Sequence, residues 1–366
     1  MDISGKIKGI KYKILLNEKL KQFSLNKFEI NETPPTCLII HENNVIAISK
    51  WVSPKRTRSY PFERIYNSLS SSKKITVIPI IKDEGLAGDR DFIQWDTVSL
   101  MSLLDVFIIF AYYERAEVNN GNKFKITNQK FNNSYVISKI KEIEQYHSSA
   151  LHWNLNELKS NLHKIIDKVI SSYSRIGMKT NVPLHSIKGI NQFKEKIGKD
   201  VSMFMEFSRA KSQKAQEREF VTKQPKESLS SLTKAKITIN NYLGGKYFLT
   251  VDEVKITKDK ILLMEGKHSK NNTLPALSDI KDGLLKMILY SNLKDITVNG
   301  KRRKSDSVLC LTSSKLSGFI TSNNTQKQIT NFFIKNKFSK TQIEIMKKLI
   351  SEAKKNKFTL NVKFSK

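Results

Sequence analysis

Two carboxylates and a lysine in the C-terminal half have the spacing that metal-dependent hydrolysis of a phosphodiester requires. Asp252 lies in one apolar stretch, and Glu265 and Lys267 end the next. Such hydrolysis needs a divalent cation, oxygen ligands for it and a group that orients the attacking water. Magnesium usually binds through one or two carboxylates together with waters and phosphate oxygens. Side chains two residues apart share a face of a strand, so Glu265 and Lys267 are expected on one side. The pattern predicts a Mg²⁺ site held by Asp252 and Glu265, with Lys267 orienting water and stabilising phosphate charge.

The Glu-x-Lys spacing alone is weak, because it recurs by chance in a chain so rich in lysine. The copies at 157–159 and 352–354 fall in windows with helical spacing. Only the copy at 265–267 follows a buried-type apolar run with a carboxylate upstream of it. Glu253, next to Asp252, remains an alternative metal ligand.

Strands and helices with a defined order are expected around these residues. The expected elements are a helix at Asn191–Ala215, strands at Lys236–Ile239, Lys246–Ile256 and Lys260–Gly266, a helix at Ser278–Asn292 capped by Ser278 and Asp279, strands at Asp295–Val298 and Ser307–Thr312, a helix at Lys340–Asn356 and a strand at Phe358–Phe364. The core order is therefore helix, three strands, helix, strand.

This constellation resembles the PD-(D/E)xK nuclease superfamily, and is most similar to the type II restriction endonucleases. The resemblance covers roughly residues 187–312, and it departs from the family motif at Val251, where proline is usual. It implies an α/β fold with a restriction-endonuclease-like mixed-sheet core in the C-terminal half. It also implies that Glu206, on the preceding helix, joins the metal site.

The charge of the chain favours a polyanionic partner. The 366 residues include 64 lysines and arginines against 34 acids, a formal net charge of +30. Nothing in the sequence forms a basic amphipathic anchor for a membrane, so a nucleic acid is the favoured partner.

Two basic segments are candidates for contact with DNA. The first lies on the helix expected around residues 206–220, and the second is a loop of four cations suited to phosphate contacts. Their candidate residues are Arg209, Lys211, Lys214 and Arg218 on the helix, and Lys301, Arg302, Arg303 and Lys304 in the loop. A solvated charged face explains the helix segment equally simply. For the four-cation loop phosphate contact is favoured, although a nuclear localisation signal uses the same chemistry. A further basic loop occupies residues 55–58.

The N-terminal part has the pattern of a separate α/β domain. Apolar runs at Thr36–Ile40 and Val45–Trp51 predict a hairpin, and Lys74–Ile81 and Val106–Tyr113 predict strands. A short helix at Thr97–Leu104 is expected to be capped by Asp96. The expected division is an α/β domain for recognition or dimerisation at 1–130, a helical connection at 131–186 and the nuclease domain at 187–366.

Two further features complete the N-terminal expectations. Helices are expected at Asn133–His147 and at Asn156–Ser174, the second of them capped by Asn154 or Asn156. The acidic segment 82–97 has no lysine two places after an acid, which favours a structural or subunit-contact loop.

The resulting hypothesis is a type II site-specific deoxyribonuclease that uses Mg²⁺, cuts double-stranded DNA and leaves a 5′-phosphate. A palindromic target would require a homodimer, and a cognate DNA methyltransferase would be a genetic partner. A cytoplasmic location is expected, since the two cysteines form no disulfide framework and no segment reads as a leader or a membrane span. A repair or recombination nuclease of the same superfamily, or a non-catalytic nucleic-acid-binding protein, remain alternatives.

Overall fold

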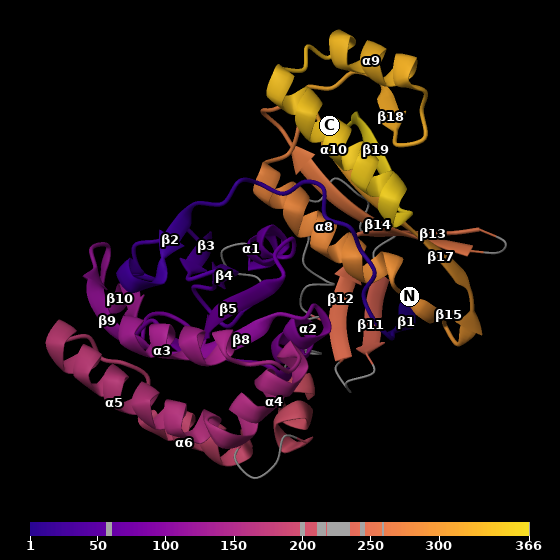
Figure 1. Ribbon diagram of the computed structural model, residues 1–366. Coiled ribbons are helices and arrows are strands. Elements are labelled where there is room, and N and C mark those ends of the chain that lie inside the picture. The colour runs from indigo at the N-terminus through magenta and orange to yellow at the C-terminus, as the bar shows by residue number, and fades with distance from the viewer. Residues whose placement is uncertain are drawn as a thin grey trace. The chain divides into compact units, whose positions relative to one another are not determined.

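A computed structural model describes residues 1–55, 61–197, 202–210, 217, 235–241, 246–257 and 260–365. The protein is a mixed α/β structure with several mixed sheets (Figure 1). It divides into two compact units, one of residues 1–18 and 212–366 and the other of residues 19–211. These bounds differ from the expected boundaries at 130 and 186, because the first 18 residues belong with the C-terminal half.

The unit that contains the C-terminus is built on two five-stranded sheets. The first has the order β12 (Lys246–Val251), β11 (Ala235–Asn241), β1 (Asp2–Ile7), β15 (Lys294–Val298), β16 (Lys301–Arg302). The N-terminal strand β1 lies parallel to β11 and antiparallel to β15, so it fills the centre of a sheet made otherwise from residues beyond 234.

The second sheet of this unit carries the candidate chemistry. Its order is β13 (Glu253–Ile256), β14 (Lys260–Ser269), β17 (Lys304–Ser313), β19 (Thr359–Phe364), β18 (Phe319–Thr321). Strand β14 is antiparallel to β13 and parallel to β17. From residue 235 onwards, the described helices of the unit are α8 (Leu277–Ser291), α9 (Gln326–Lys335) and α10 (Lys340–Asn356). Helix α8 packs across β14 and β17, while α10 packs on β19.

A segment after β1 is tied to this unit through a buried glutamate. Glu352 of α10 is fully buried. Its Oε2 accepts hydrogen bonds from the backbone N–H groups of Leu15 and Leu16, and its Oε1 accepts one from Tyr12 Oη. Charge-assisted hydrogen bonds of this kind are the stronger ones, so they hold the segment firmly.

The unit of residues 19–211 has its own sheet and helices. The sheet order is β2 (Gln22–Ser24), β3 (Thr36–His41), β4 (Asn44–Lys50), β5 (Lys73–Pro79), β8 (Phe107–Ala111), and two hairpins pair β6 (Ile81–Asp83) with β7 (Arg90–Phe92) and β9 (Tyr113–Asn119) with β10 (Asn122–Phe131). The helices are η1 (Leu25–Lys27), α1 (Pro61–Ser68), α2 (Trp95–Leu103), α3 (Asn133–Glu144), α4 (Ala150–Ser160), α5 (Leu162–Thr180) and α6 (Ile187–Ile197), and residues 202–210 are also helical.

Most of the strongly patterned elements are confirmed, but three predicted helix caps are wrong. Helix α2 begins at Trp95 with Gln94 at the N-cap, so Asp96 lies buried in the first turn. Helix α8 has Ala276 at its N-cap and no side-chain cap, because it starts one residue before Ser278. Helix α4 begins at Ala150, where Ser149 accepts a hydrogen bond from the backbone N–H of His152.

The helix expected at Asn156–Ser174 is in fact two helices, α4 and α5, which meet at Asn161. Asn154 lies inside α4 and is fully buried. Its side chain accepts a hydrogen bond from the backbone N–H of Ile108 and donates one to the carbonyl of Val106. The sequence pattern places Asn154 at a helix end, but in the structure its side chain connects α4 with the strand β8. Similarly, the helix expected at Asn191–Ala215 is described as α6 and the helical residues 202–210.

No helix among the described residues is long and apolar enough to cross a membrane.

Candidate active site

Asp252 occupies the corner at which one long strand passes between the two sheets of its unit. It is the single residue between β12, in the first sheet, and β13, in the second. The pairing of β13 with β14 ends at Glu253 and Met264, so the backbone N–H of Gly266 has no strand partner on that side. The carboxylate of Asp252 accepts a hydrogen bond from this N–H group at 2.8 Å. This bond satisfies a buried donor and fixes Asp252 beside Glu265.

Glu265 and Lys267 share one face of β14, as the period of a strand requires. Glu265 is 1 % exposed. Lys267 Nζ lies 3.0 Å from Glu265 Oε1. The neighbouring strand β17 runs parallel to β14 for ten residue pairs, from Lys260–Lys304 to Ser269–Ser313, and holds β14 straight through the site. Asp252, Glu265 and Lys267 are therefore brought together from two strands.

Helix α8 adds two charged residues that the sequence pattern did not single out. Lys286 Nζ lies 2.9 Å from both carboxylate oxygens of Glu265. Asp282 Oδ2 lies 2.7 Å from Lys267 Nζ. The two residues are four apart, so they share a face of the helix. An acid and a base at this spacing after the strand were visible in the sequence, but nothing local indicates that they face β14.

Gly283 lets α8 come close to the strand that carries Lys267. A Cβ atom built on Gly283 would lie 2.8 Å from Leu309 Cδ1 and 3.3 Å from Lys267 Cε. The first distance is too short for a contact between carbon atoms, so a side chain at this position would displace Leu309 or the helix, and the second would make Lys267 shift slightly. The absence of a side chain at Gly283 therefore helps to position Lys267.

The surroundings of Glu265 disfavour the negatively charged form of its carboxyl group. Burial raises the pKa of the Glu265 carboxyl, and the charge of Asp252 raises it further, while Lys286 and Lys267 act in the opposite direction. A carboxylate that is buried beside a second carboxylate gains stability from any cation placed between them. The ammonium groups of Lys267 and Lys286 stabilise the charged form of Glu265 in this way.

Lys267 is held in its charged form. Burial lowers the pKa of Lys267, but the carboxylates of Glu265 and Asp282 outweigh this effect and raise it above the usual range for lysine. A permanently charged ammonium group can orient a water molecule and stabilise an anion, but it does not accept a proton near neutral pH.

Glu253 faces different surroundings from Asp252. Its carboxylate lies 3.2 Å from Lys255 Nζ, two residues farther along β13. Asp252, by contrast, contacts β14 at Gly266 and influences the pKa of Glu265. Of the two candidate ligands, Asp252 is thus the one whose carboxylate lies at the Glu265 site.

The donor set fits magnesium better than zinc. No group of three or more His, Cys, Asp or Glu residues lies together within the described part of the chain. The site offers two carboxylates, and magnesium typically takes one or two, with waters and phosphate oxygens completing its octahedron. Zinc would require three or four ligands that include nitrogen or sulfur.

The candidate residues between 206 and 218, which precede β11 in the chain, are only partly described. Glu206 is exposed and Arg209 half-buried on the helical residues 202–210, which belong to the unit of residues 19–211. That Glu206 takes part in the metal site therefore stays a prediction. Lys211, Lys214 and Arg218 lie outside the described residues.

The four-cation segment is a hairpin at the edge of the first sheet. Asn299 and Gly300 both have positive φ angles, 47° and 80°, as in a two-residue turn of the Asn-Gly type. Lys301, Arg302 and Lys304 are exposed, and Arg303 is half-buried. This exposure leaves the segment open to the contact with phosphate groups that the sequence suggests, which remains a prediction.

The acidic segment and the basic loop of the N-terminal half meet each other. Lys55 Nζ lies 2.8 Å from Asp91 Oδ1, and Ser53 donates a hydrogen bond to Asp91 Oδ2 at 2.9 Å. Asp91 is buried. These contacts fit a structural role for the acidic segment. Residues 56–60 of the basic loop lie outside the described residues.

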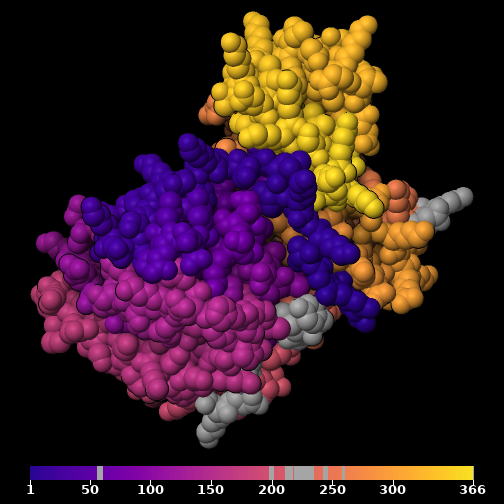
Figure 2. Space-filling view, viewed as in Figure 1, coloured from indigo at the N-terminus to yellow at the C-terminus, as the bar shows by residue number. Residues whose placement is uncertain are grey.

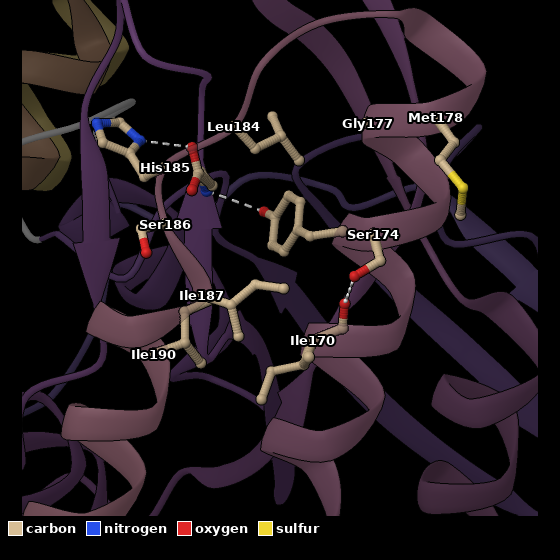
Figure 3. A pocket seen from close by; sticks show the side chains of 11 residues that line it. Ile170, Ser174, Gly177, Met178, Leu184, His185, Ser186, Ile187 and Ile190 are labelled. Atoms are coloured by element: carbon tan, nitrogen blue, oxygen red, sulfur yellow. Dashed lines mark hydrogen bonds and ion pairs between the residues drawn. The ribbon is translucent and has the colours of Figure 1, made fainter.

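A pocket of about 370 Å³ lies in the unit of residues 19–211 (Figure 3). Its lining is mostly apolar, with Ile170, Leu184 and Ile190 among the residues. Asp83 Oδ1 there lies 2.8 Å from His185 Nδ1 and also accepts a hydrogen bond from the backbone of Gly85. The pocket holds one carboxylate, already engaged, and so lacks the paired ligands that the β14 site provides.

Comparison of the chain with models of known protein families, with curated proteins and with solved structures finds no match. The functional argument therefore depends on the chemistry of the site.

Proposed function

We propose that this protein is a magnesium-dependent endonuclease of the PD-(D/E)xK type, acting on double-stranded DNA. The observation that carries the proposal is the meeting of Asp252, Glu265 and Lys267 at one corner of the second sheet. Asp252 and Glu265 would hold the metal, whose chemistry when bound is to acidify a water molecule and to neutralise charge on the phosphate. Lys267, held in place by Asp282, would orient that water and stabilise the charge that develops on the phosphate.

The strand order supports the proposal. Three successive antiparallel strands, β11, β12 with β13, and β14, are followed by α8 and then by β17, which is parallel to β14. This is the order that the resemblance implies for a restriction-endonuclease-like core. The arrangement departs from the expected single mixed sheet in two places. Strands β11 and β12 lie in the first sheet and not with β13 and β14 in the second, and β15 and β16, which lie between α8 and β17 in the chain, also belong to the first sheet.

Site-specific cleavage of the type II restriction kind, leaving 5′-phosphates, is the finer part of the proposal. A homodimer would match the symmetry of a palindromic site. A cognate methyltransferase would then protect the host DNA as a genetic partner. This part depends on the resemblance and on the strong positive charge of the chain.

The test is digestion of unmethylated phage DNA with Mg²⁺ by the wild-type protein and by Lys267→Ala. The variant is expected to lower the cleavage rate about 10³-fold, since removal of one group that stabilises transition-state charge costs roughly this much. Lys255→Ala is the matched control, because Lys255 lies on the same hairpin but pairs with Glu253. Asp252→Asn is expected to abolish cleavage, and Glu253→Gln to leave it nearly unchanged.

Each outcome of the digest distinguishes between the functions considered. Discrete bands support a restriction endonuclease, whereas unspecific degradation supports a repair or recombination nuclease with the same site. If the wild-type protein shows no Mg²⁺-dependent cleavage, both nuclease proposals fail and a non-catalytic nucleic-acid-binding protein remains.

A further inference from the structure

The C-terminal lobe, defined as residues 315–366, concentrates positive charge far beyond the rest of the chain. It contains twelve lysines, no arginine and two glutamates, a formal net charge of +10 in 52 residues. The unit of residues 19–211 has 29 lysines and arginines against 19 acids, which is the same net charge over 193 residues. Self-repulsion of this density disfavours the compact state, so a function that uses the charge is expected.

Most of the lobe lysines that the structure describes are exposed, and those described have no carboxylate partner. Ten of the eleven that are described are exposed: Lys315, Lys327, Lys335, Lys337, Lys340, Lys347, Lys348, Lys354, Lys355 and Lys357. Within the described residues, none of the eleven forms an ion pair with a carboxylate. Glu352 is buried against the segment after β1, which leaves Glu344 as the one exposed acid among the described residues of the lobe.

The two helices of the lobe have well-defined ends, and the lobe forms part of the surface of the molecule (yellow in Figure 2). Helix α9 and helix α10 each begin with a capping box, formed by Thr325 with Gln328 and by Ser339 with Gln342. Phe338, in the turn between the helices, stacks on Phe333 at 5.2 Å. These contacts fix the two helices and hence the side chains that they expose.

The exposed face of α10 carries two rows of lysines. Met346, Leu349 and Ala353 are buried on the opposite side of the helix, towards β19. One row consists of Lys340, Lys347 and Lys354, and the other of Lys348 and Lys355. Each row repeats every seven residues, so its lysines lie nearly above one another at steps of about 10 Å along the axis.

We propose that this face of α10, with the neighbouring lysines of the lobe, binds the phosphate backbone of double-stranded DNA. The proposal rests on the proposed function in taking DNA as the polyanion. Carboxylates at the β14 site repel phosphate, so cations elsewhere in the chain must supply the affinity for the substrate. The lobe belongs to the same unit as that site, and ten of its eleven described lysines are exposed without a carboxylate partner among the described residues.

The chemistry of the lobe indicates contact with the backbone and not with bases. Reading of guanine typically uses the fork of an arginine, and the lobe has no arginine. Lysine is a compact point charge that suits phosphate groups without geometric selectivity. A membrane surface is disfavoured for the face of α10, because the exposed large hydrophobic residues of the lobe, Phe319, Ile334 and Phe364, all lie outside this helix.

The test measures how tightly the wild-type protein and a variant bind an end-labelled duplex of mixed sequence. Binding is measured in a chelating buffer without Mg²⁺, at several salt concentrations. The variant replaces Lys347, Lys348, Lys354 and Lys355 with glutamine. Its slope of log affinity against log salt is expected to fall by about 3 to 4, and its affinity at low salt about tenfold or more, equally for unrelated sequences. The matched control replaces four exposed helical lysines of the other unit, Lys159, Lys164, Lys179 and Lys188, and is expected to change neither quantity.

The proposal is overturned if the lobe variant keeps the wild-type affinity and salt slope, or if the control loses as much. It is also overturned if duplex binding persists while binding to a single-stranded RNA or to vesicles of anionic lipid is lost. If the proposed nuclease function is wrong but the lobe binds DNA, the result is different. Duplex binding then still depends on the lobe, whereas addition of Mg²⁺ produces no cleavage. Thermal unfolding of both variants, followed by circular dichroism, shows whether each remains folded.

Discussion

The C-terminal lobe and the unit of residues 19–211 have the same formal net charge of +10 but use their cations differently. In the unit of residues 19–211, the described lysines and arginines in ion pairs are Lys55, Lys74, Lys82, Arg90, Lys130, Lys139 and Lys194. In the lobe, no described lysine has such a partner. A paired and buried lysine contributes through its position, whereas an exposed and unpaired lysine contributes through summed charge. The first kind is therefore sensitive to single substitutions, and the second to their number and to salt.

The lysines of the β14 site belong to the paired kind, although they share a unit with the lobe. Lys267 and Lys286 both contact Glu265, and Asp282 holds Lys267 from the other side. Proximity in the fold therefore does not decide how a lysine acts in this protein. What decides it is whether a carboxylate lies within reach of its ammonium group.

The largest effect on cleavage that we expect beyond the test at Lys267 is at Gly283, whose substitution leaves every charge unchanged. Gly283→Ala is expected to lower the cleavage rate about tenfold, since the added methyl group displaces Leu309 and shifts Lys267, and even a small misplacement of a catalytic group lowers the rate. Binding of the duplex without Mg²⁺ should stay at the wild-type level. Single-turnover cleavage and anisotropy measure the two quantities. An unchanged rate would mean that the position of Lys267 is not fixed by its contact with α8.

Lys139 tests the paired kind in the other unit. Its Nζ lies 3.1 Å from Glu157 Oε1 and 2.7 Å from Glu142 Oε2, and Glu157 is buried. Lys139→Met is expected to lower the free energy of unfolding by about 3 kcal/mol, because it leaves a buried carboxylate uncompensated. Urea unfolding measures the change. Lys327→Met, in the lobe, is the control and should remain within about 0.5 kcal/mol of the wild type. Equal losses in the two variants would contradict the distinction between the two kinds of lysine.

Lys286 should compete with the metal for Glu265. Both carboxylate oxygens of Glu265 lie 2.9 Å from Lys286 Nζ, so a metal ion bound there must displace this ammonium group. Lys286→Met is expected to tighten binding of Mn²⁺ about tenfold, equivalent to roughly 1.4 kcal/mol. Titration calorimetry or electron paramagnetic resonance measures the affinity, and Lys286→Arg is the charge-preserving control. Weaker binding in the methionine variant would show that Lys286 supports the metal site and does not compete for it.

The smallest effect is expected for a single lysine of the lobe. Lys347→Gln should weaken duplex binding only two- to threefold and reduce the salt slope by about 1, as the loss of one phosphate contact predicts. If this one substitution lowered the affinity for the duplex a hundredfold, Lys347 would act through its specific position, as the paired lysines do, and not through summed charge. The same anisotropy titration as for the fourfold variant measures it.

Strong local patterns allowed much of the unit with the C-terminus to be predicted. The apolar run at Ile261–Met264 and the alternation after it locate β14 and place Glu265 and Lys267 on one face. Weak patterns were missed. The short strand β18 and the helix α9 have few buried residues, and β9 and β10 are largely charged or polar on their exposed side. A strand or helix that buries little of its surface leaves little periodicity in its sequence.

Contacts between distant segments were also beyond prediction. The strand β1 pairs with β11, more than 230 residues later in the chain, and nothing in its six residues specifies that partner. Backbone hydrogen bonds in a sheet do not depend on side-chain identity, so the partner of a strand depends on the whole fold.

The sequence by itself determined the chemical types and the local geometry of the candidate site, because strand periodicity and apolar runs act over a few residues. It also determined the excess of lysine in the last 52 residues. Only the tertiary structure decided that Asp252, and not Glu253, lies beside Glu265, and that Asp282 and Lys286 complete the ion pairs. It alone separated paired from unpaired lysines, since ion pairs such as Lys139–Glu157 and Lys286–Glu265 join side chains from different elements, and that meeting is a property of the fold.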